Sequence, residues 1–99
     1  MVQSKQGTLN IAGTILSTGI LGKITQIASF NFYNAAGYVL TIQKFQFSTA
    51  STITLGVYTK LAGETFEIPN SYYLADGDYY KVTPSIAGTD YNFIENIIG

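Results

Sequence analysis

The sequence predicts an all-β fold, a small antiparallel β-sandwich or barrel of jelly-roll-like form with an extended N-terminal arm. Short runs of alternating apolar and polar residues, rich in Tyr, Ile and Thr, are separated by Gly, Asn, Asp, Ser and Pro. That pattern is typical of strands and turns, and no long apolar stripe has helical spacing. The 99 residues suffice for one domain. We therefore expect a β domain over residues 23–99, preceded by an arm or first strand over residues 1–22.

Residues 7–21 are expected to act as an arm that contacts another chain. They carry no charge between Lys5 and Lys23, and such an arm is sticky unless it pairs with a partner. Gly7, Gly13 and Gly19 lie six residues apart, a spacing also found in β-solenoid stems, although we favour a simple glycine-punctuated strand or arm. The apolar run in this segment is too short and too polar to span a membrane, and no signal-peptide cleavage site follows it cleanly.

The following strands are predicted in order from the spacing of their apolar residues. Residues 23–33 alternate, as a half-buried strand does. The next strand begins at Tyr38 and changes parity around residues 43–44, which indicates a β-bulge or a crossing between two sheets. Residues 53–59 resume a clean period of two and predict a further strand.

The dipeptide Asp76-Gly77 predicts a β-hairpin over residues 72–80. Asp-Gly between alternating strand-forming residues favours a two-residue type I′ turn. In that register Tyr73 lies opposite Tyr80, which would give a stacked aromatic pair across the ladder.

The last predicted strand covers residues 89–98 and has apolar residues on both faces. Phe93 and Ile97 share one face, whereas Ile94 and Ile98 share the other. We therefore expect this strand to be covered twice, in the fold or against another subunit.

The residue types that are missing from the chain argue against most kinds of catalytic and ligand-binding site. The chain has no His, Cys, Arg or Trp, so a neutral-pH acid/base, a thiolate and a bidentate phosphate clamp are absent. Asp76 and Asp78 have the spacing of half a calcium loop, but a solvated hairpin tip explains both. The five lysines are dispersed along the chain and do not form the basic patch that nucleic-acid binding needs. We expect no enzyme activity, no catalytic, cofactor or metal residues, no cofactor, and neither nucleic acid nor membrane as partner.

The low charge favours self-association instead. Only 11% of the residues are charged, with a net charge of −1, whereas soluble domains average about 25%. A neutral surface is poorly suited to a free monomer. The contact surface is predicted from exposed apolar and tyrosine side chains, namely Leu9, Ile11, Ile15, Leu16, Ile20, Tyr73, Tyr80, Ile94 and Ile98.

Two segments, residues 63–66 (Gly-Glu-Thr-Phe) and residues 72–82 (YYLADGDYYKV), carry a family resemblance. Together with the neutral, cysteine-free, Thr/Ser/Tyr-rich composition, they resemble strand-turn-strand phrases in small structural proteins of tailed bacteriophages. The resemblance implies a virion component: a capsid decoration, head-fibre or tail accessory protein assembled in the host cytoplasm. Its implied partners are copies of itself, expected as a trimer, and other capsid or tail proteins.

Two alternatives stay open on the sequence. One is a β-sandwich module that binds carbohydrate or peptide through exposed tyrosines, since Tyr combines an apolar ring with a hydroxyl. The other is a secreted or pilus-like subunit, which a mature N-terminus beyond residue 21 would favour.

Overall fold

The computed structural model describes residues 2–68 and 72–99, which form two antiparallel sheets and no α-helix. A 3₁₀ turn, η1 (Phe47–Thr49), follows the fourth strand. The strands are β1 (Val2–Thr8), β2 (Thr14–Thr18), β3 (Ile24–Tyr33), β4 (Tyr38–Gln46), β5 (Ser51–Lys60), β6 (Thr65–Ile68), β7 (Tyr72–Leu74), β8 (Tyr79–Pro84) and β9 (Asp90–Ile98).

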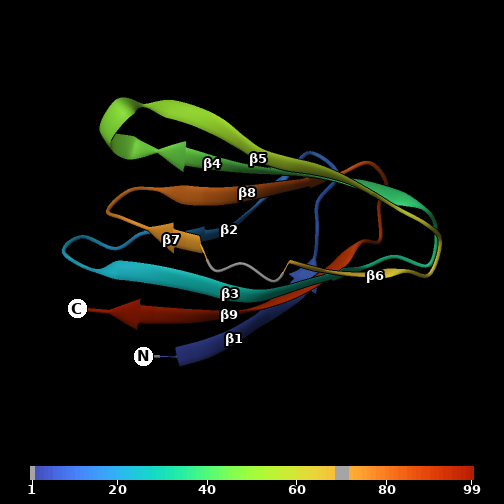
Figure 1. Ribbon diagram of the computed structural model, residues 1–99, viewed down its shortest axis with the longest axis horizontal. Helices are drawn as coiled ribbons and strands as arrows, with labels where there is room; N and C mark the ends of the chain where they lie inside the picture. Colours follow the sequence, from blue (N-terminus) through green and yellow to red (C-terminus); the bar gives the residue numbers. More distant parts are fainter. Residues whose placement is uncertain (1, 69–71) are drawn as a thin grey trace.

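The two sheets face each other as the layers of a sandwich (Figure 1). The five-stranded sheet has the order β1-β9-β3-β6, with β7 also paired to β3. The four-stranded sheet has the order β2-β8-β4-β5. The all-β sandwich predicted from the sequence is confirmed.

The strand order is that of a jelly roll. The chain moves from sheet to sheet, so that β1, β3 and β9 lie in one sheet and β2, β4 and β8 in the other. The last strand therefore lies between the first and third, and β8 lies between β2 and β4. This interleaving of early and late strands is the double Greek key of jelly rolls.

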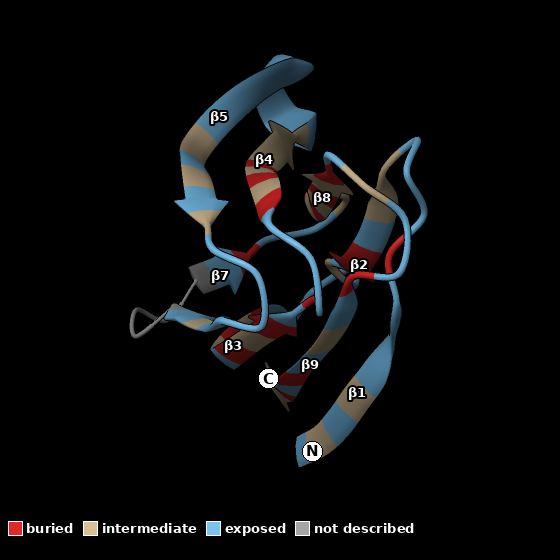
Figure 2. Ribbon diagram, turned by 90° about the vertical axis from the view of Figure 1, so that its right-hand side faces the viewer, coloured by how far each residue is buried: buried red, intermediate tan, exposed pale blue. Residues whose placement is uncertain are grey.

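The core is aromatic and lies between the sheets. The Phe30 ring on β3 lies 5.4 Å from the Phe93 ring and 6.4 Å from the Tyr80 ring, measured between centroids. Alternate residues of β4 and β8 are buried, which is the period of two expected for strands with one covered face (Figure 2). Because β8 belongs to the four-stranded sheet, these rings join the two layers.

The N-terminal segment, expected as an arm or first strand, forms two edge strands of its own domain. Residues 2–8 pair with β9 as the edge of the five-stranded sheet, and residues 14–18 pair with β8 as the edge of the other. Leu9 and Leu16 lie in the core. Burial of these two side chains and two backbone ladders hold the segment on its own domain.

The hairpin predicted over residues 72–80 is wrong, although the turn within it exists. The Asp78 N–H donates to the Ala75 carbonyl at 3.1 Å, and Gly77 has a φ of 77°. However, β7 pairs with β3 and β8 pairs with β2 and β4, so the turn connects the two sheets. Tyr73 and Tyr80 are therefore not cross-strand neighbours.

The parity change predicted around residues 43–44 coincides with a register shift. In the ladder of β4 with β5, Ile42 lies opposite Gly56 and Gln43 lies opposite Thr54. The extra residue is Leu55, so the bulge belongs to β5, and β4 itself continues regularly beside β8.

Candidate functional site

The outer face of the five-stranded sheet carries exposed apolar side chains from four strands. The side chains of residues paired in a ladder point to the same side of a sheet. The register therefore defines which residues lie on this face. Val2, Asn96, Gln26 and Tyr73 form one row across β1, β9, β3 and β7, and Ile24 lies opposite Ile98. We call this surface the apolar face, defined by Val2, Ile24, Tyr73, Ile94 and Ile98.

The apolar face is open to solvent in the single chain. Val2 is 67% exposed, Tyr73 53% and Ile24 51%. Between the apolar residues lie strand residues that are polar but uncharged, namely Ser4, Gln6, Gln26, Asn92 and Asn96. Exposed apolar residues separated only by uncharged polar ones are typical of a contact site.

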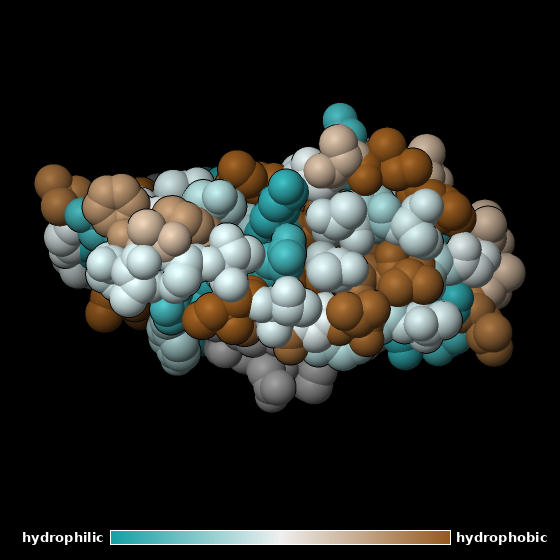
Figure 3. All heavy atoms as spheres, turned by 90° about the horizontal axis from the view of Figure 1, so that it is seen from above, coloured by the Kyte–Doolittle hydropathy of each residue, from teal (hydrophilic) through white to brown (hydrophobic). Residues whose placement is uncertain are grey.

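The outer face of the four-stranded sheet differs from the apolar face. Figure 3 looks onto this side from above and shows pale, weakly polar residues with brown ones set apart among them. One ladder row contains the stacked rings of Phe45 and Tyr79, 4.9 Å apart, and ends at Thr52 on β5. Lys81 and Gln43 are adjacent in the next row. This face therefore carries a charged residue, Lys81, among apolar and weakly polar side chains.

A groove of about 500 Å³ opens between the β1 and β9 edge of one sheet and β2 of the other. Both walls mix aliphatic and polar side chains. The lining residues are Gln3, Lys5, Ile15, Leu16, Ser17, Thr18, Ile20, Glu95 and Ile97.

Glu95 is the buried ionisable group of this groove. The Ser17 hydroxyl donates to its Oε2 at 2.5 Å, and the Gln3 amide donates to its Oε1 at 2.6 Å. The Lys5 ammonium lies 3.5 Å from Oε1. These three partners come from β1 and β2, so one carboxylate on β9 links both N-terminal strands to the fold.

The pKa of Glu95 lies below its usual value. Burial by itself raises this pKa, but hydrogen bonds from Ser17 and Gln3 and the charge of Lys5 outweigh that effect. A carboxylate that is already paired and has a lowered pKa is a weak base. The arrangement therefore supports a structural link rather than acid/base catalysis.

The lowered pKa predicts a loss of stability in acid. A depressed folded-state pKa contributes stability above the unfolded value of about 4.3 and loses it as pH falls through the folded value. We expect the wild-type protein to lose more stability between pH 7 and pH 3 than the Glu95→Gln variant does, measured by urea unfolding. Equal losses in both proteins would contradict the role assigned to Glu95.

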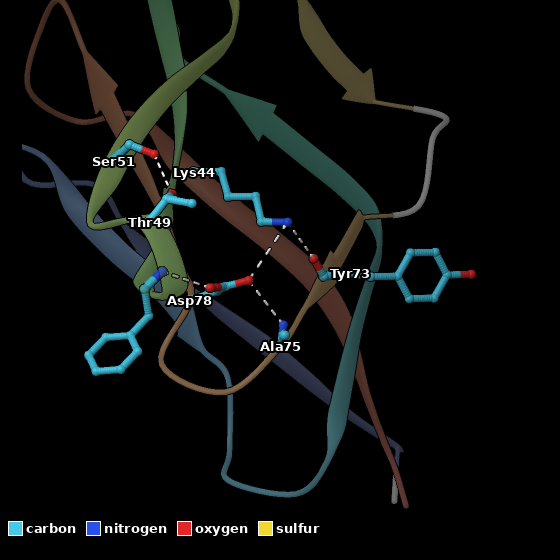
Figure 4. A network of polar contacts seen from close by, with 7 residues as sticks. Lys44, Thr49, Ser51, Tyr73, Ala75 and Asp78 are labelled. Carbon is cyan, nitrogen blue, oxygen red and sulfur yellow. Dashed lines mark hydrogen bonds and ion pairs between the residues drawn. The ribbon is translucent and has the colours of Figure 1, made fainter.

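Asp78 belongs to a second polar network, where it acts on the backbone. Its carboxylate accepts hydrogen bonds from the Phe47 N–H at 2.9 Å and the Ala75 N–H at 3.2 Å. Lys44 donates to the Tyr73 carbonyl at 3.1 Å and lies 3.9 Å from the Asp78 carboxylate, while the Tyr73 ring points away from the network (Figure 4). The hydrogen bonds of Asp78 therefore stabilise the turn between the sheets.

The structure separates the predicted contact residues into three groups. Ile94 and Ile98, 39% and 47% exposed, lie with Tyr73 on the apolar face. Ile15 and Ile20 line the groove, and Ile11 is exposed in the turn after β1. For the remaining three, Leu9, Leu16 and Tyr80, the prediction of a surface position is wrong, because all lie in the core.

Three residues of these surfaces were not anticipated from the sequence. Glu95 has the parity of Phe93 and Ile97, so the alternation of the last strand places it inward. Val2 and Ile24 join the apolar face only through their ladders with β9. Strand pairing of this kind leaves no local pattern in the sequence.

Comparison of the chain with protein-family models, curated proteins and solved structures found no match. Among residues 2–68 and 72–99, no group of three or more His, Cys, Asp or Glu side chains could hold a metal ion. A search of the same residues found no helix with the length and apolar character of a membrane span.

Proposed function

We propose that this chain is a non-enzymatic assembly protein of a virion, such as a capsid decoration, head-fibre or tail accessory protein, acting through self-association. The observation that carries the proposal is the apolar face: exposed Val2, Ile24, Tyr73, Ile94 and Ile98 with uncharged strand residues between them. The charged residues on this side of the sheet, Asp90 and Glu67, lie toward its other end. The jelly-roll order adds weak support, since viral capsid domains use this fold among many others.

The chemistry of the apolar face favours a second copy of the chain as its occupant. An uncharged face meets its own copy without repulsion, whereas it offers nothing to attract an anionic or cationic partner. A face that meets its like gives a two-fold contact, while the trimer expected from the sequence would need a second, different patch. The mass of the purified assembly decides between these two arrangements.

The apolar face by itself makes a small contact. Four strands about 4.8 Å apart, which average about seven residues in length at about 3.3 Å per residue, span roughly 400 Å² per copy. A standard interface buries about 800 Å² per partner. We therefore expect a weak contact at this face and a further contact elsewhere on the molecule.

The variant Ile94→Lys is expected to weaken self-association by about tenfold or more. The lysine places a charge at the centre of the uncharged face, and about 1.4 kcal/mol of lost contact and desolvation corresponds to a factor of ten. Light scattering over a concentration series measures the effect. Leu61→Lys is the matched control, because Leu61 is 76% exposed in the connection between β5 and β6, at the opposite end from the chain termini (Figure 1).

A wild-type protein that stays monomeric at tens of micromolar would contradict the assembly role. So would an Ile94→Lys variant that associates as strongly as Leu61→Lys. The carbohydrate- or peptide-binding alternative is less well supported, since Tyr80 is 1% exposed and only Tyr73 of the predicted pair reaches solvent. We do not propose it.

A further inference from the structure

The edges of the two sheets differ in how well they are protected from pairing with another strand. Natural sheets block exposed edges with short strands, inward-pointing charges, bulges and prolines. At one edge β1 directs Lys5 inward to Glu95, and β2 has five residues and a register shift after Ile15. The opposite edge of the five-stranded sheet consists of the short strands β6 and β7.

Strand β5 has the bulge at Leu55 and the inward-pointing Lys60 at its end, but it is long and contains no proline. It has ten residues, Ser51–Lys60, and its charged residue is the terminal Lys60. None of its residues is buried, although it is as long as β3, and Figure 2 shows it without red while β3, β4 and β8 carry red bands. Ile53 lies opposite Lys44, whose side chain points between the sheets, yet Ile53 is 41% exposed. The edge of β5 and the inner side of its first half are therefore open, whereas Tyr58 in its second half packs against Phe66 of the other sheet, with ring centroids 4.6 Å apart.

We propose that β5 is a second self-association site, where it pairs antiparallel with β5 of another copy and joins two four-stranded sheets into one. This inference rests on the proposed assembly role and supplies the further contact that the small apolar face requires. The occupant is a β-strand, because an open edge offers a row of backbone N–H and C=O groups.

The sequence of β5 is complementary to itself. A two-fold axis between Leu55 and Gly56 pairs all ten residues, with Ile53 opposite Tyr58 and Thr52 opposite Thr59 of the other copy. Ile with Tyr and Thr with Thr are favourable cross-strand pairs. The two Lys60 side chains lie at opposite ends of the joint, about 30 Å apart, so they do not repel each other.

The bulge makes this register consistent with the two faces of the sheet. Because Leu55 is the extra residue, inward residues on its two sides differ in parity: Ile53 before it, Tyr58 after it. Pairing the first half of one strand with the second half of the other therefore places inward residues opposite inward residues. A ten-residue antiparallel pair forms about ten backbone hydrogen bonds. It also covers the exposed side of Ile53.

Disulfide trapping with Thr52→Cys/Thr59→Cys tests the register directly. The natural chain contains no cysteine, and both positions are exposed, so the two thiols are the sole reactive ones. Within one chain these positions are about 23 Å apart along the strand, too far for a disulfide. We expect a covalent dimer on non-reducing gels from the double variant. The single variants Thr52→Cys and Thr59→Cys, whose thiols remain far apart in the pair, should stay monomeric.

A double variant that forms no dimer, even with a short bismaleimide, would overturn the proposal. Equal dimer yields from the single variants would overturn it too, because they would indicate another register or random collision. Ile53→Lys on the double-cysteine background should lower the dimer yield about tenfold. Val57→Lys should leave the yield unchanged, because Val57 faces outward in its own chain, opposite Thr41, and the proposed register places it opposite the uncharged Thr54 of the other copy.

The same experiment separates this proposal from the apolar face. Adding Ile94→Lys to the cysteine pair should leave trapping at β5 intact, since the two surfaces belong to different sheets. Trapping that persists while Ile94→Lys fails to weaken association would overturn the role of the apolar face alone. In the reverse result, Ile94→Lys weakens association but no disulfide forms at β5. That result would overturn the pairing through β5 and leave the role of the apolar face intact.

Discussion

Replacement of Tyr80 by alanine is expected to lower the free energy of unfolding by about 3–5 kcal/mol. The Tyr80 side chain is 1% exposed and meets the Phe30 ring edge-on, with centroids 6.4 Å apart. Its removal leaves a cavity where the aromatic residues of the two sheets meet. Urea or thermal unfolding followed by circular dichroism measures the loss.

Tyr73→Ala is the matched control for this change. Tyr73 comes from the same segment, but its ring is 53% exposed on the apolar face, so we expect a change within about 0.5 kcal/mol. Comparable losses from the two substitutions would contradict the placement of Tyr80 in the core. Self-association should be weakened more by Tyr73→Ala than by Tyr80→Ala, because Tyr73 lies on the surface proposed for self-association.

The error about this tyrosine pair shows which part of the fold the sequence could predict. Apolar alternation and turn residues identified the strands and the turn at Asp76-Gly77, because both are local properties. Which sheet each arm of the turn joins depends on residues far along the chain. Tyr73 on β7 pairs with Gln26, and Tyr80 on β8 pairs with Lys44 and Ser17. Local turn chemistry contains no information about these partners.

The N-terminal segment illustrates a second limit of the same kind. An uncharged run rich in Ile, Leu and Thr is compatible with two structures: an arm that pairs with another chain, and an edge strand that pairs within its own sheet. In the structure Leu9 and Leu16 lie in the core and Ile11 and Ile15 remain exposed. The sequence predicts that the segment pairs with a partner, and in the structure it pairs with β9 and β8 of the same chain.

Strand β9 shows where the alternation was informative. Apolar residues on both faces predicted that it would be covered twice, and Phe93 indeed lies in the core while Ile94 and Ile98 point to the apolar face. Coverage of that second face by another copy stays a prediction. The same alternation points Glu95 inward, so the buried carboxylate could be read from parity, whereas its partners Gln3 and Ser17 could not.

Replacement of Glu95 by alanine is expected to lower the free energy of unfolding by about 2–3 kcal/mol. Each lost hydrogen bond to a charged group, and each buried polar partner left unsatisfied, costs about 1–3 kcal/mol. Here the affected partners are the Ser17 hydroxyl, which is buried, and the half-buried Gln3 amide. Glu67→Ala, at an exposed position on β6, is the control and should change the stability by less than about 0.5 kcal/mol.

The loss in Glu95→Ala should be concentrated in β1, because two of the partners of this carboxylate, Gln3 and Lys5, lie on that strand. Strand β1 has no buried residue and pairs with β9 alone. Local opening of β1 therefore breaks few interactions besides this ladder. Trypsin cleavage after Lys5 reports this opening, while cleavage after the exposed Lys23 serves as the internal reference. We expect cleavage after Lys5 to accelerate about tenfold or more relative to Lys23 in Glu95→Ala, and not in Glu67→Ala. Equal acceleration at both sites would mean that Glu95 stabilises the whole domain and does not specifically hold its first strand.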